Sequence, residues 1–395
     1  MKFWQTYIDR QKAEYLETPF PEDFDADAVV VIPCYDEQEL ETTLKNLLQC
    51  MPSTGKILVA IIINSSIRSK QQIVDQNRKT HQETVRFAQQ NNRENIRFFP
   101  LVLENLPRKH AGVGLARKIG MDLSILHFLR NEKSDGIIIS LDADCKVSPN
   151  FLADIETAYR KEKKLCCTVQ NFHHRLESED PVLENAIRQY EEHIRYFSRA
   201  LQFTGFPYYL HTIGSAFSVS ARAYVKTGGM GRQQGGEDFY FLQKVFALEN
   251  TRFLKEAFVY PLARFSDRIP FGTGPALQKI IDDADGVMKT YSFNAFAELK
   301  KLFDLRKSFF RASTDEIENE IMTLHPAVVQ FCLETGVVQE IEDSNRNSAS
   351  YQSFEKRFFH HFNAFKIIKF LNATHPSPFY HGTARTEVDK METTL

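Results

Sequence analysis

The sequence predicts an α/β protein with a mostly parallel sheet, helices on both faces of that sheet, and a helical C-terminal region. Short apolar runs of strand length alternate with helical stretches in the first part of the chain, and such alternation is typical of parallel sheets. Polar residues directly follow several of these runs, at the sheet edge where ligands bind in this class of protein. Later in the chain, apolar residues recur every three or four positions, which predicts helices.

Four continuous apolar runs are the expected strands, because strands covered on both faces contain few polar residues. They are AVVVIP (28–33), ILVAIII (57–63), RFFPLVL (97–103) and GIIISL (136–141). Between them, helices are expected around 70–91 and 115–130. A further helix is expected after the first strand, where Asp36 and Glu39 have the spacing of a capping box.

The rest of the sheet domain is expected to contain a helix over 182–204, a strand at 216–220 and a helix that begins near Glu237. Beyond residue 275 the pattern is helical, with an exposed loop expected at 342–350 and disorder at the extreme C-terminus. The predicted organisation is therefore a sheet domain over 1–275 and a mainly helical extension over 276–395.

Composition and charge exclude several classes of protein. The 395-residue chain has 49 basic and 51 acidic residues, so its formal net charge of -2 gives no overall attraction to nucleic acid. No apolar stretch approaches the roughly 18 to 20 residues that cross a bilayer, and the charged N-terminus does not resemble a signal peptide. The six cysteines show no CxxC pair or disulfide framework. We therefore expect a cytoplasmic protein without nucleic-acid partners or transmembrane segments, for which peripheral membrane contact stays open.

Two aspartates follow the expected strand at 136–141. Side chains alternate along an extended chain, so Asp142 and Asp144 point the same way, with backbones about 6.6 Å apart. Carboxylate oxygens suit Mg²⁺ or Mn²⁺, which leave their other positions to water and substrate phosphate. An acidic turn is the alternative interpretation, since aspartate is common in turns.

Two glycine-containing segments are each open to two interpretations. RKHAGVGLARKIG (108–120) brings Arg108, Lys109 and Arg117 near a helix start, where they either meet a diphosphate or remain solvated. GGEDFYFLQKV (235–245) brings Glu237 and Asp238 to a helix N-terminus, as capping groups or as a general base.

Taken together and in order, five segments resemble a family 2 glycosyltransferase of GT-A fold over roughly residues 28–275. They are VVVIPCYDEQELETTLKNLL, GVGLARKIGMDLS, IIISLDADCKVSPNFL, GSAFSVSARAYVKTGGM and GGEDFYFLQKV. The resemblance implies a Rossmann-like nucleotide-diphospho-sugar transferase sheet, with a nucleotide-binding half at about 26–150 and an acceptor half at about 151–275. The chain lacks the QxxRW motif and membrane helices of processive members, so it is more similar to the soluble, non-processive, bacterial type.

The implied activity is hexosyl transfer, with inversion and a single addition. The donor is a nucleotide-diphosphate sugar, such as a UDP- or GDP-sugar, and the acceptor hydroxyl belongs to a carbohydrate, a lipid-linked molecule or a small molecule. Asp142 and Asp144 would hold Mn²⁺ or Mg²⁺ against the diphosphate. Asp238, next to Glu237, would take the acceptor proton.

The resemblance also implies which other residues line the site. The expected donor-binding residues are Pro33, Tyr35, Asp36, Glu37, Asn64, Lys109, Gly114, Arg117, Asp142, Ala143 and Asp144. The residues expected on the acceptor side, or in a loop over the donor, are His211, Gly214, Arg264 and Arg268. Family members usually have an aspartate where this chain has Asn64, which leaves recognition of the nucleobase open.

Other functions remain as alternatives at this stage. A retaining GT-A transferase or a nucleotidyltransferase would use the same fold, although PCYDE (33–37) lacks the glycine-rich, arginine-containing first loop of nucleotidyltransferases. A non-catalytic sugar-nucleotide-binding protein would use the same pocket, although the acidic residues are intact.

Overall fold

The chain folds into two compact units. The computed structural model describes residues 2–11, 14–51, 53–109, 111–177, 179–233, 235–265, 272–283 and 285–394. The first unit, here the sheet unit, comprises Met1–Asp180 and Thr212–Ala276, and the second, the helical unit, comprises Pro181–His211 and Leu277–Leu395. The sheet unit thus ends one residue from the boundary expected at 275. Pro181–His211, which the sequence boundaries assign to the sheet domain, belongs to the helical unit.

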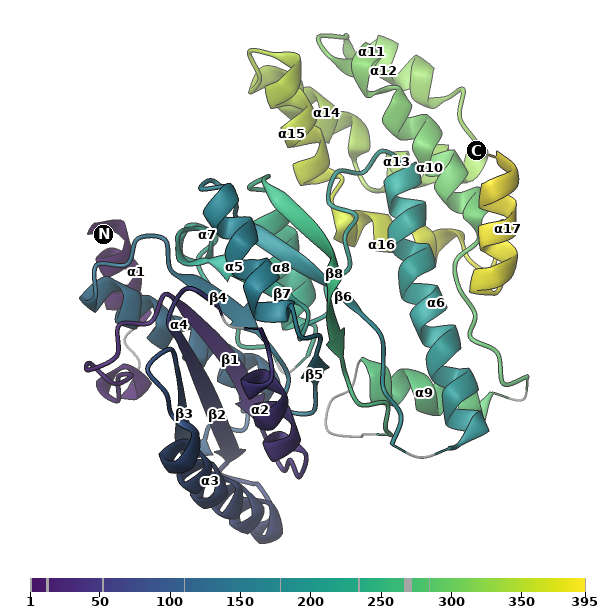
Figure 1. The fold of residues 1–395 in the computed structure, drawn as a ribbon. Helices are drawn as coiled ribbons and strands as arrows, with labels where there is room; N and C mark the ends of the chain where they lie inside the picture. Colours follow the sequence, from purple (N-terminus) through teal and green to yellow (C-terminus); the bar gives the residue numbers. More distant parts are fainter. Residues whose placement is uncertain are drawn as a thin grey trace. The chain divides into compact units, whose positions relative to one another are not determined.

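The sheet unit contains one eight-stranded sheet with the order β3-β2-β1-β4-β7-β6-β8-β5 (Figure 1). The strands are β1 (Ala28–Cys34), β2 (Ile57–Ser66), β3 (Ile96–Leu106), β4 (Ile137–Ser140), β5 (Lys146–Val147), β6 (Cys167–Phe172), β7 (Phe217–Ser220) and β8 (Thr251–Tyr260). β3, β2, β1 and β4 are parallel to one another, and β6 is parallel to β8. β7 and β5 run antiparallel to their neighbours. The predicted mostly parallel sheet is confirmed.

The position of β3 explains why its apolar run contains a proline. Pro100 has no N–H group to donate to a neighbouring strand, so proline is tolerated chiefly at sheet edges. β3 is one of the two edge strands of the sheet and pairs only with β2 among the described strands. The sequence run at 97–103 is therefore compatible with a strand at this position.

Helices cover both faces of the sheet, as predicted. The helices of this unit are α1 (Lys2–Gln11), a short 3-10 helix (Glu14–Glu17), α2 (Leu40–Leu48), α3 (Gln71–Asn91), α4 (Val113–Arg130), α5 (Phe151–Lys161), α7 (Ala221–Lys226) and α8 (Glu237–Phe246). On one face, Val30 and Ile32 of β1 share an apolar core with Leu44 of α2, Phe87 of α3 and Ile155 of α5.

The opposite face of β1 packs against α4. The contact between α4 and β1 is so close that a Cβ atom at Gly120 would collide with Val31. Alternate residues of β1 therefore bury against different helices, as the two-residue period of a strand requires. This arrangement accounts for the continuous apolar sequence of the strand.

A buried carboxylate fixes the N-terminal segment to α4. Asp122 is fully buried and accepts hydrogen bonds from the phenols of Tyr7 on α1 (2.6 Å), Tyr15 (2.7 Å) and Tyr224 on α7 (2.8 Å). The Lys118 Nζ atom lies 2.8 Å from Asp122 Oδ2 and supplies the opposite charge. A buried charge is tolerated only when it is paired and hydrogen-bonded in this way.

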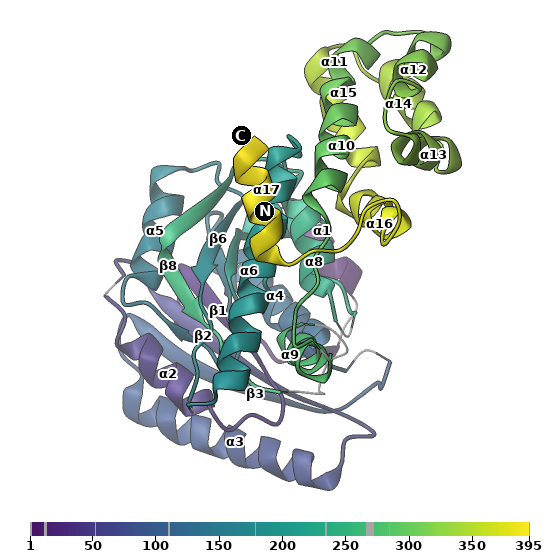
Figure 2. The same cartoon turned by 90° about the vertical axis from the view of Figure 1, so that its right-hand side faces the viewer.

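The helical unit consists of α6 (Pro181–Phe203), the end of α9 (Thr273–Asp282), α10 (Phe293–Asp304), α11 (Arg306–Phe309), α12 (Thr314–Ile321), α13 (Pro326–Glu334), α14 (Val337–Arg346), α15 (Tyr351–His361), α16 (Ala364–Thr374) and α17 (Ala384–Thr394). Figure 2 shows α12, α13 and α14 grouped beyond α10. The apolar residues that recur every three or four positions pack within this unit: the Phe303 ring meets the Phe358 and Phe362 rings edge-on, with centroids 5.8 and 5.1 Å apart.

Among the described residues, no helix combines the length and apolar character needed to cross a membrane.

Two sequence expectations for this unit are wrong. The loop expected at 342–350 begins later, because α14 continues to Arg346 and buries Ser344. The C-terminus, expected to be disordered, forms α17. That helix is held by the buried Glu387, whose Oε2 atom accepts the backbone N–H of Phe293 at 2.7 Å.

We expect Asp122→Ala to lower the free energy of unfolding by about 3 to 5 kcal/mol, because it leaves the buried Lys118 ammonium unpaired. Glu41→Ala is the matched control, since Glu41 and Lys45 are an i,i+4 pair with the side chains 63% and 62% exposed. The control should change stability by no more than about 0.5 kcal/mol. Urea denaturation of both variants measures the difference, and equal losses would contradict the structural role of Asp122.

Candidate active site

Three adjacent parallel strands bring polar residues to one edge of the sheet. β1 lies between β2 and β4. Asp36 and Glu37 follow β1, Asn64 lies near the end of β2, and Asp142 and Asp144 follow β4. These are the carboxyl ends of the strands, where ligands bind in open α/β sheets.

The turn after β1 is held by a chain of amide hydrogen bonds. The Asp36 backbone is left-handed (φ 48°), and its N–H group donates to Asn77 Oδ1 at 2.9 Å. Asn77 Nδ2 donates to the Asn64 carbonyl (2.8 Å), and Asn64 Nδ2 donates to the Cys34 carbonyl (3.2 Å). The Asn64 Oδ1 atom is buried and has no hydrogen-bond partner within the described ranges. Asn77 lies in the middle of α3, and nothing in its sequence context indicates this role.

Glu37, rather than the expected Asp36 and Glu39 pair, satisfies backbone donors ahead of α2. Its Oε1 atom accepts the N–H groups of Gln38 (2.9 Å) and Glu39 (3.0 Å). Glu39 occupies the N-cap position of α2, but its side chain makes no capping hydrogen bond among the described residues. The predicted capping box is therefore wrong, because α2 begins only at Leu40 and Asp36 lies three residues before its N-cap position.

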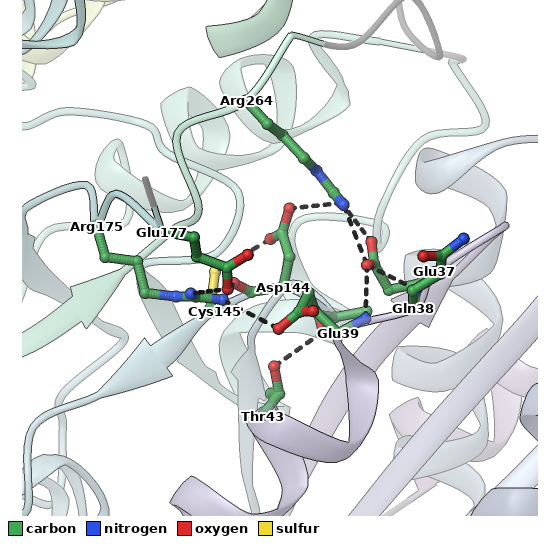
Figure 3. A network of polar contacts seen from close by, with 10 residues as sticks. Glu37, Gln38, Glu39, Thr43, Asp144, Cys145, Arg175, Glu177 and Arg264 are labelled. Carbon is green, nitrogen blue, oxygen red and sulfur yellow. Dashed lines mark hydrogen bonds and ion pairs between the residues drawn. The ribbon is translucent and has the colours of Figure 1, made fainter. Parts of the chain in front are cut away.

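Arg264 bridges the turn after β1 and the segment after β4 (Figure 3). Its Nη2 atom contacts Glu37 Oε2 and lies 2.9 Å from Asp144 Oδ2, while its Nη1 atom donates to Glu37 Oε1 at 3.2 Å. Glu37 is 3% exposed, whereas the Asp144 and Arg264 side chains are 21% and 28% exposed. Arg175, which sequence reasoning missed, donates from Nη2 to the Asp144 carbonyl at 3.2 Å.

A second arginine connects the segment after β4 to α8. Arg117 of α4 is buried, and its Nη2 atom lies 2.6 Å from Asp142 Oδ1. Its Nη1 atom contacts Glu237, which is also buried, at the first position of α8. The Arg117 Nε atom has no hydrogen-bond partner in the described part of the chain. Asp142 and Asp144 are thus neutralised by different arginines.

Asp238 lies beside this arginine and is half-buried. A Cβ atom at Gly214 would lie 2.9 Å from both Arg117 Nη2 and Asp238 Oδ2, so only glycine leaves room for these two groups. Burial raises the pKa of Asp238 to about 7, the negative charge of Glu237 raises it as well, and Arg117 opposes both effects. A carboxyl group with this pKa can accept a proton near neutral pH.

The remaining predicted residues are placed as follows. Pro33 and Ala143 are buried, Tyr35 is half-buried, and Lys109 is exposed in the loop before α4. Gly114 lies in the first turn of α4, where a Cβ atom would collide with the Gln233 carbonyl. His211 is the last residue of Pro181–His211 in the helical unit. Arg268 lies outside the described residues.

The comparisons with known proteins identify fold-level likenesses only. No protein-family model and no curated protein matches the chain. A structure of S. aureus TarS 1-349 in complex with UDP-GlcNAc is similar, with a TM-score of 0.40, 11% identity, and coverage of 85% of this chain and 91% of that chain. The same protein with UDP gives a TM-score of 0.38, 10% identity, and coverage of 86% and 91%. Similarity at this level decides nothing about the chemistry of the site.

We expect the Asp238 carboxyl to titrate near pH 7 in the donor-free and metal-free protein. Carbon-13 NMR of labelled aspartate measures this titration directly. Glu237→Gln should lower the Asp238 pKa, because it removes a negative charge that favours the protonated form. Asp135→Asn, which changes an exposed aspartate (73%), should leave it unchanged. A wild-type midpoint near the ordinary aspartate value of about 3.9 would contradict this description of the site.

Proposed function

We propose that this protein is a glycosyltransferase that moves one sugar from a nucleotide-diphosphate sugar to an acceptor hydroxyl, with inversion and with a divalent cation. One observation carries the proposal: Asp238, whose pKa is raised by burial to about 7, is linked through Arg117 and Glu237 to Asp142 after β4. A candidate base and a candidate cation ligand therefore belong to one connected cluster. The five ordered segments that resemble family 2 glycosyltransferases support the same assignment.

Asp238 is suited to act as the general base. It lies in the first turn of α8, behind Gly236 in a left-handed conformation (φ 70°). A helix holds the carboxylate more rigidly than a loop would, and a base positioned in this way typically contributes roughly 10²- to 10⁴-fold to the rate. The raised pKa makes the carboxylate a stronger proton acceptor than an ordinary aspartate.

Asp142 and Asp144 would hold Mn²⁺ or Mg²⁺, because their hard oxygen atoms suit these cations. The donor set fits a cation, since the Asp144 carboxylate already contacts a guanidinium and the Asp142 side chain is 38% exposed. The described residues include no group of three or more His, Cys, Asp or Glu side chains that could hold a metal ion. Donor phosphate and water would therefore complete the coordination. A bound cation offsets the negative charge that develops on the leaving diphosphate.

Inversion is supported by the state of Glu237. A retaining double displacement requires a second carboxylate that attacks the sugar, and Glu237 is the nearest neighbour of Asp238 in sequence. Its side chain is buried against Arg117 rather than directed to solvent. A single displacement assisted by Asp238 fits this arrangement better.

The absence of a disulfide framework among the cysteines supports a cytoplasmic location, where thiols remain reduced.

We expect Asp238→Asn to reduce sugar transfer by roughly 10²- to 10⁴-fold while donor binding remains. Asp144→Asn should abolish turnover of the donor, because the diphosphate loses its cation. Transfer is measured by release of the nucleoside diphosphate, and binding by calorimetry with the intact donor. Asp135→Asn again serves as the control. Near wild-type transfer in both variants would refute the assignment.

We also expect a UDP- or GDP-sugar to raise the thermal unfolding temperature, and to raise it further with Mn²⁺, because ligands that bind the folded state stabilise it. Once a donor and an acceptor are known, proton NMR of the first product reports the anomeric configuration. A retained configuration would favour the retaining alternative. Donor binding without hydrolysis or transfer across a panel of acceptors would instead favour a non-catalytic sugar-nucleotide-binding protein.

A further inference from the structure

We propose that Arg264 is a resident counterion that occupies the position of the divalent cation and must leave Glu37 and Asp144 before the cation binds. The inference rests on the proposed function, because it concerns the cation that this function requires. In the cation-free protein, the two carboxylates at this position are Glu37 and Asp144, whereas Asp142 is paired with Arg117. The proposal makes Arg264 the residue that regulates access to the cation position.

The geometry of the contact is the first support. The Arg264 Nη2 atom lies 2.9 Å from Asp144 Oδ2 and also contacts Glu37 Oε2 (Figure 3). The two carboxylates come from different strand ends and converge on one positively charged nitrogen. A divalent cation at the same point would meet one oxygen from each carboxylate, which are the ligands that Mg²⁺ and Mn²⁺ prefer.

The charges give the second support. Glu37 is 3% exposed, and an ionised carboxylate buried to this degree is costly without a cationic partner. Arg264 supplies one positive charge against the two negative charges of Glu37 and Asp144. A divalent cation supplies two positive charges and so balances the charge of both carboxylates. Replacing Arg264 with the cation therefore leaves neither carboxylate with less positive charge beside it than before.

The anchoring of Arg264 gives the third support. The neighbouring residue, Ala263, donates its N–H to the Arg175 carbonyl at 2.9 Å, and the Arg175 N–H donates to the Pro261 carbonyl at 2.8 Å. The backbone next to Arg264 is therefore fixed by main-chain hydrogen bonds. The Arg264 side chain itself is 28% exposed, whereas the Arg117 side chain is 2% exposed. Arg264 can thus leave by rotation of its side chain alone, while Arg117 is enclosed between its two carboxylates.

The released guanidinium would remain near the cation, where it can bind a diphosphate through paired hydrogen bonds. The Arg264 guanidinium would then pair with the phosphates of the donor instead of with Glu37 and Asp144. Because the same side chain opposes cation binding alone and favours the donor, cation and nucleotide should bind with positive coupling. Without nucleotide, cation binding should be weak.

The test measures Mn²⁺ binding to the full-length, nucleotide-free protein by electron paramagnetic resonance. Arg264→Met should bind Mn²⁺ about 10-fold more tightly than the wild type, within the usual range of coupling factors. Added UDP should strengthen Mn²⁺ binding to the wild type but have much less effect on Arg264→Met. Arg252→Met is the matched control, since it removes an arginine with a 47% exposed side chain that pairs with Glu162 at 3.5 Å. The control should behave as the wild type.

Two further variants keep the test decisive. Arg264→Lys retains a charge at this position, so it should fold even where Arg264→Met does not, and its Mn²⁺ affinity should lie between those of the wild type and Arg264→Met. Asp144→Asn combined with either substitution should abolish the gain, which places the ion at this carboxylate. Unchanged or weaker Mn²⁺ binding in folded Arg264→Lys and Arg264→Met would overturn the proposal. Tighter Mn²⁺ binding in these variants, together with no sugar transfer by the wild-type protein, would refute the proposed function alone.

Discussion

The buried ion pairs of Arg117 are the interaction on which the site depends. One guanidinium joins a carboxylate after β4 to a carboxylate on α8. Arg117 and Glu237 are both buried, and a buried charge is tolerated when it has a partner of opposite sign. The same arginine, acting through its charge, limits how far burial and Glu237 raise the pKa of Asp238.

Much of the sheet was predictable because its central strands are apolar on both faces. The runs at 28–33, 57–63 and 136–141 correspond to β1, β2 and β4 within a few residues. β5, β6 and β8 were not predicted, and for β8 the reason is physical. β8 alternates irregularly between exposed and buried residues, so its sequence has neither a continuous apolar run nor a clean two-residue period.

The candidate site was predictable in its acidic residues but not in its pairings. Asp142, Asp144, Glu237 and Asp238 are conspicuous because carboxylates directly follow a strand or begin a helix. The partners of these groups come from distant segments. Arg264 and Glu37 are separated by 227 residues in sequence, and no local pattern indicates such a contact. For the same reason, Arg117 was expected at a phosphate and instead lies between two carboxylates.

The hydrogen bonds of Tyr7, Tyr15 and Tyr224 to Asp122 constrain the order in which the chain can fold during synthesis. Tyr7 and its acceptor are 115 residues apart, and Tyr224 follows that acceptor by a further 102. At typical translation rates, the first helix leaves the ribosome on the order of ten seconds before Asp122 does. During this interval the α1 segment has no α4 to pack against. Its apolar residues therefore stay exposed and are available to chaperones.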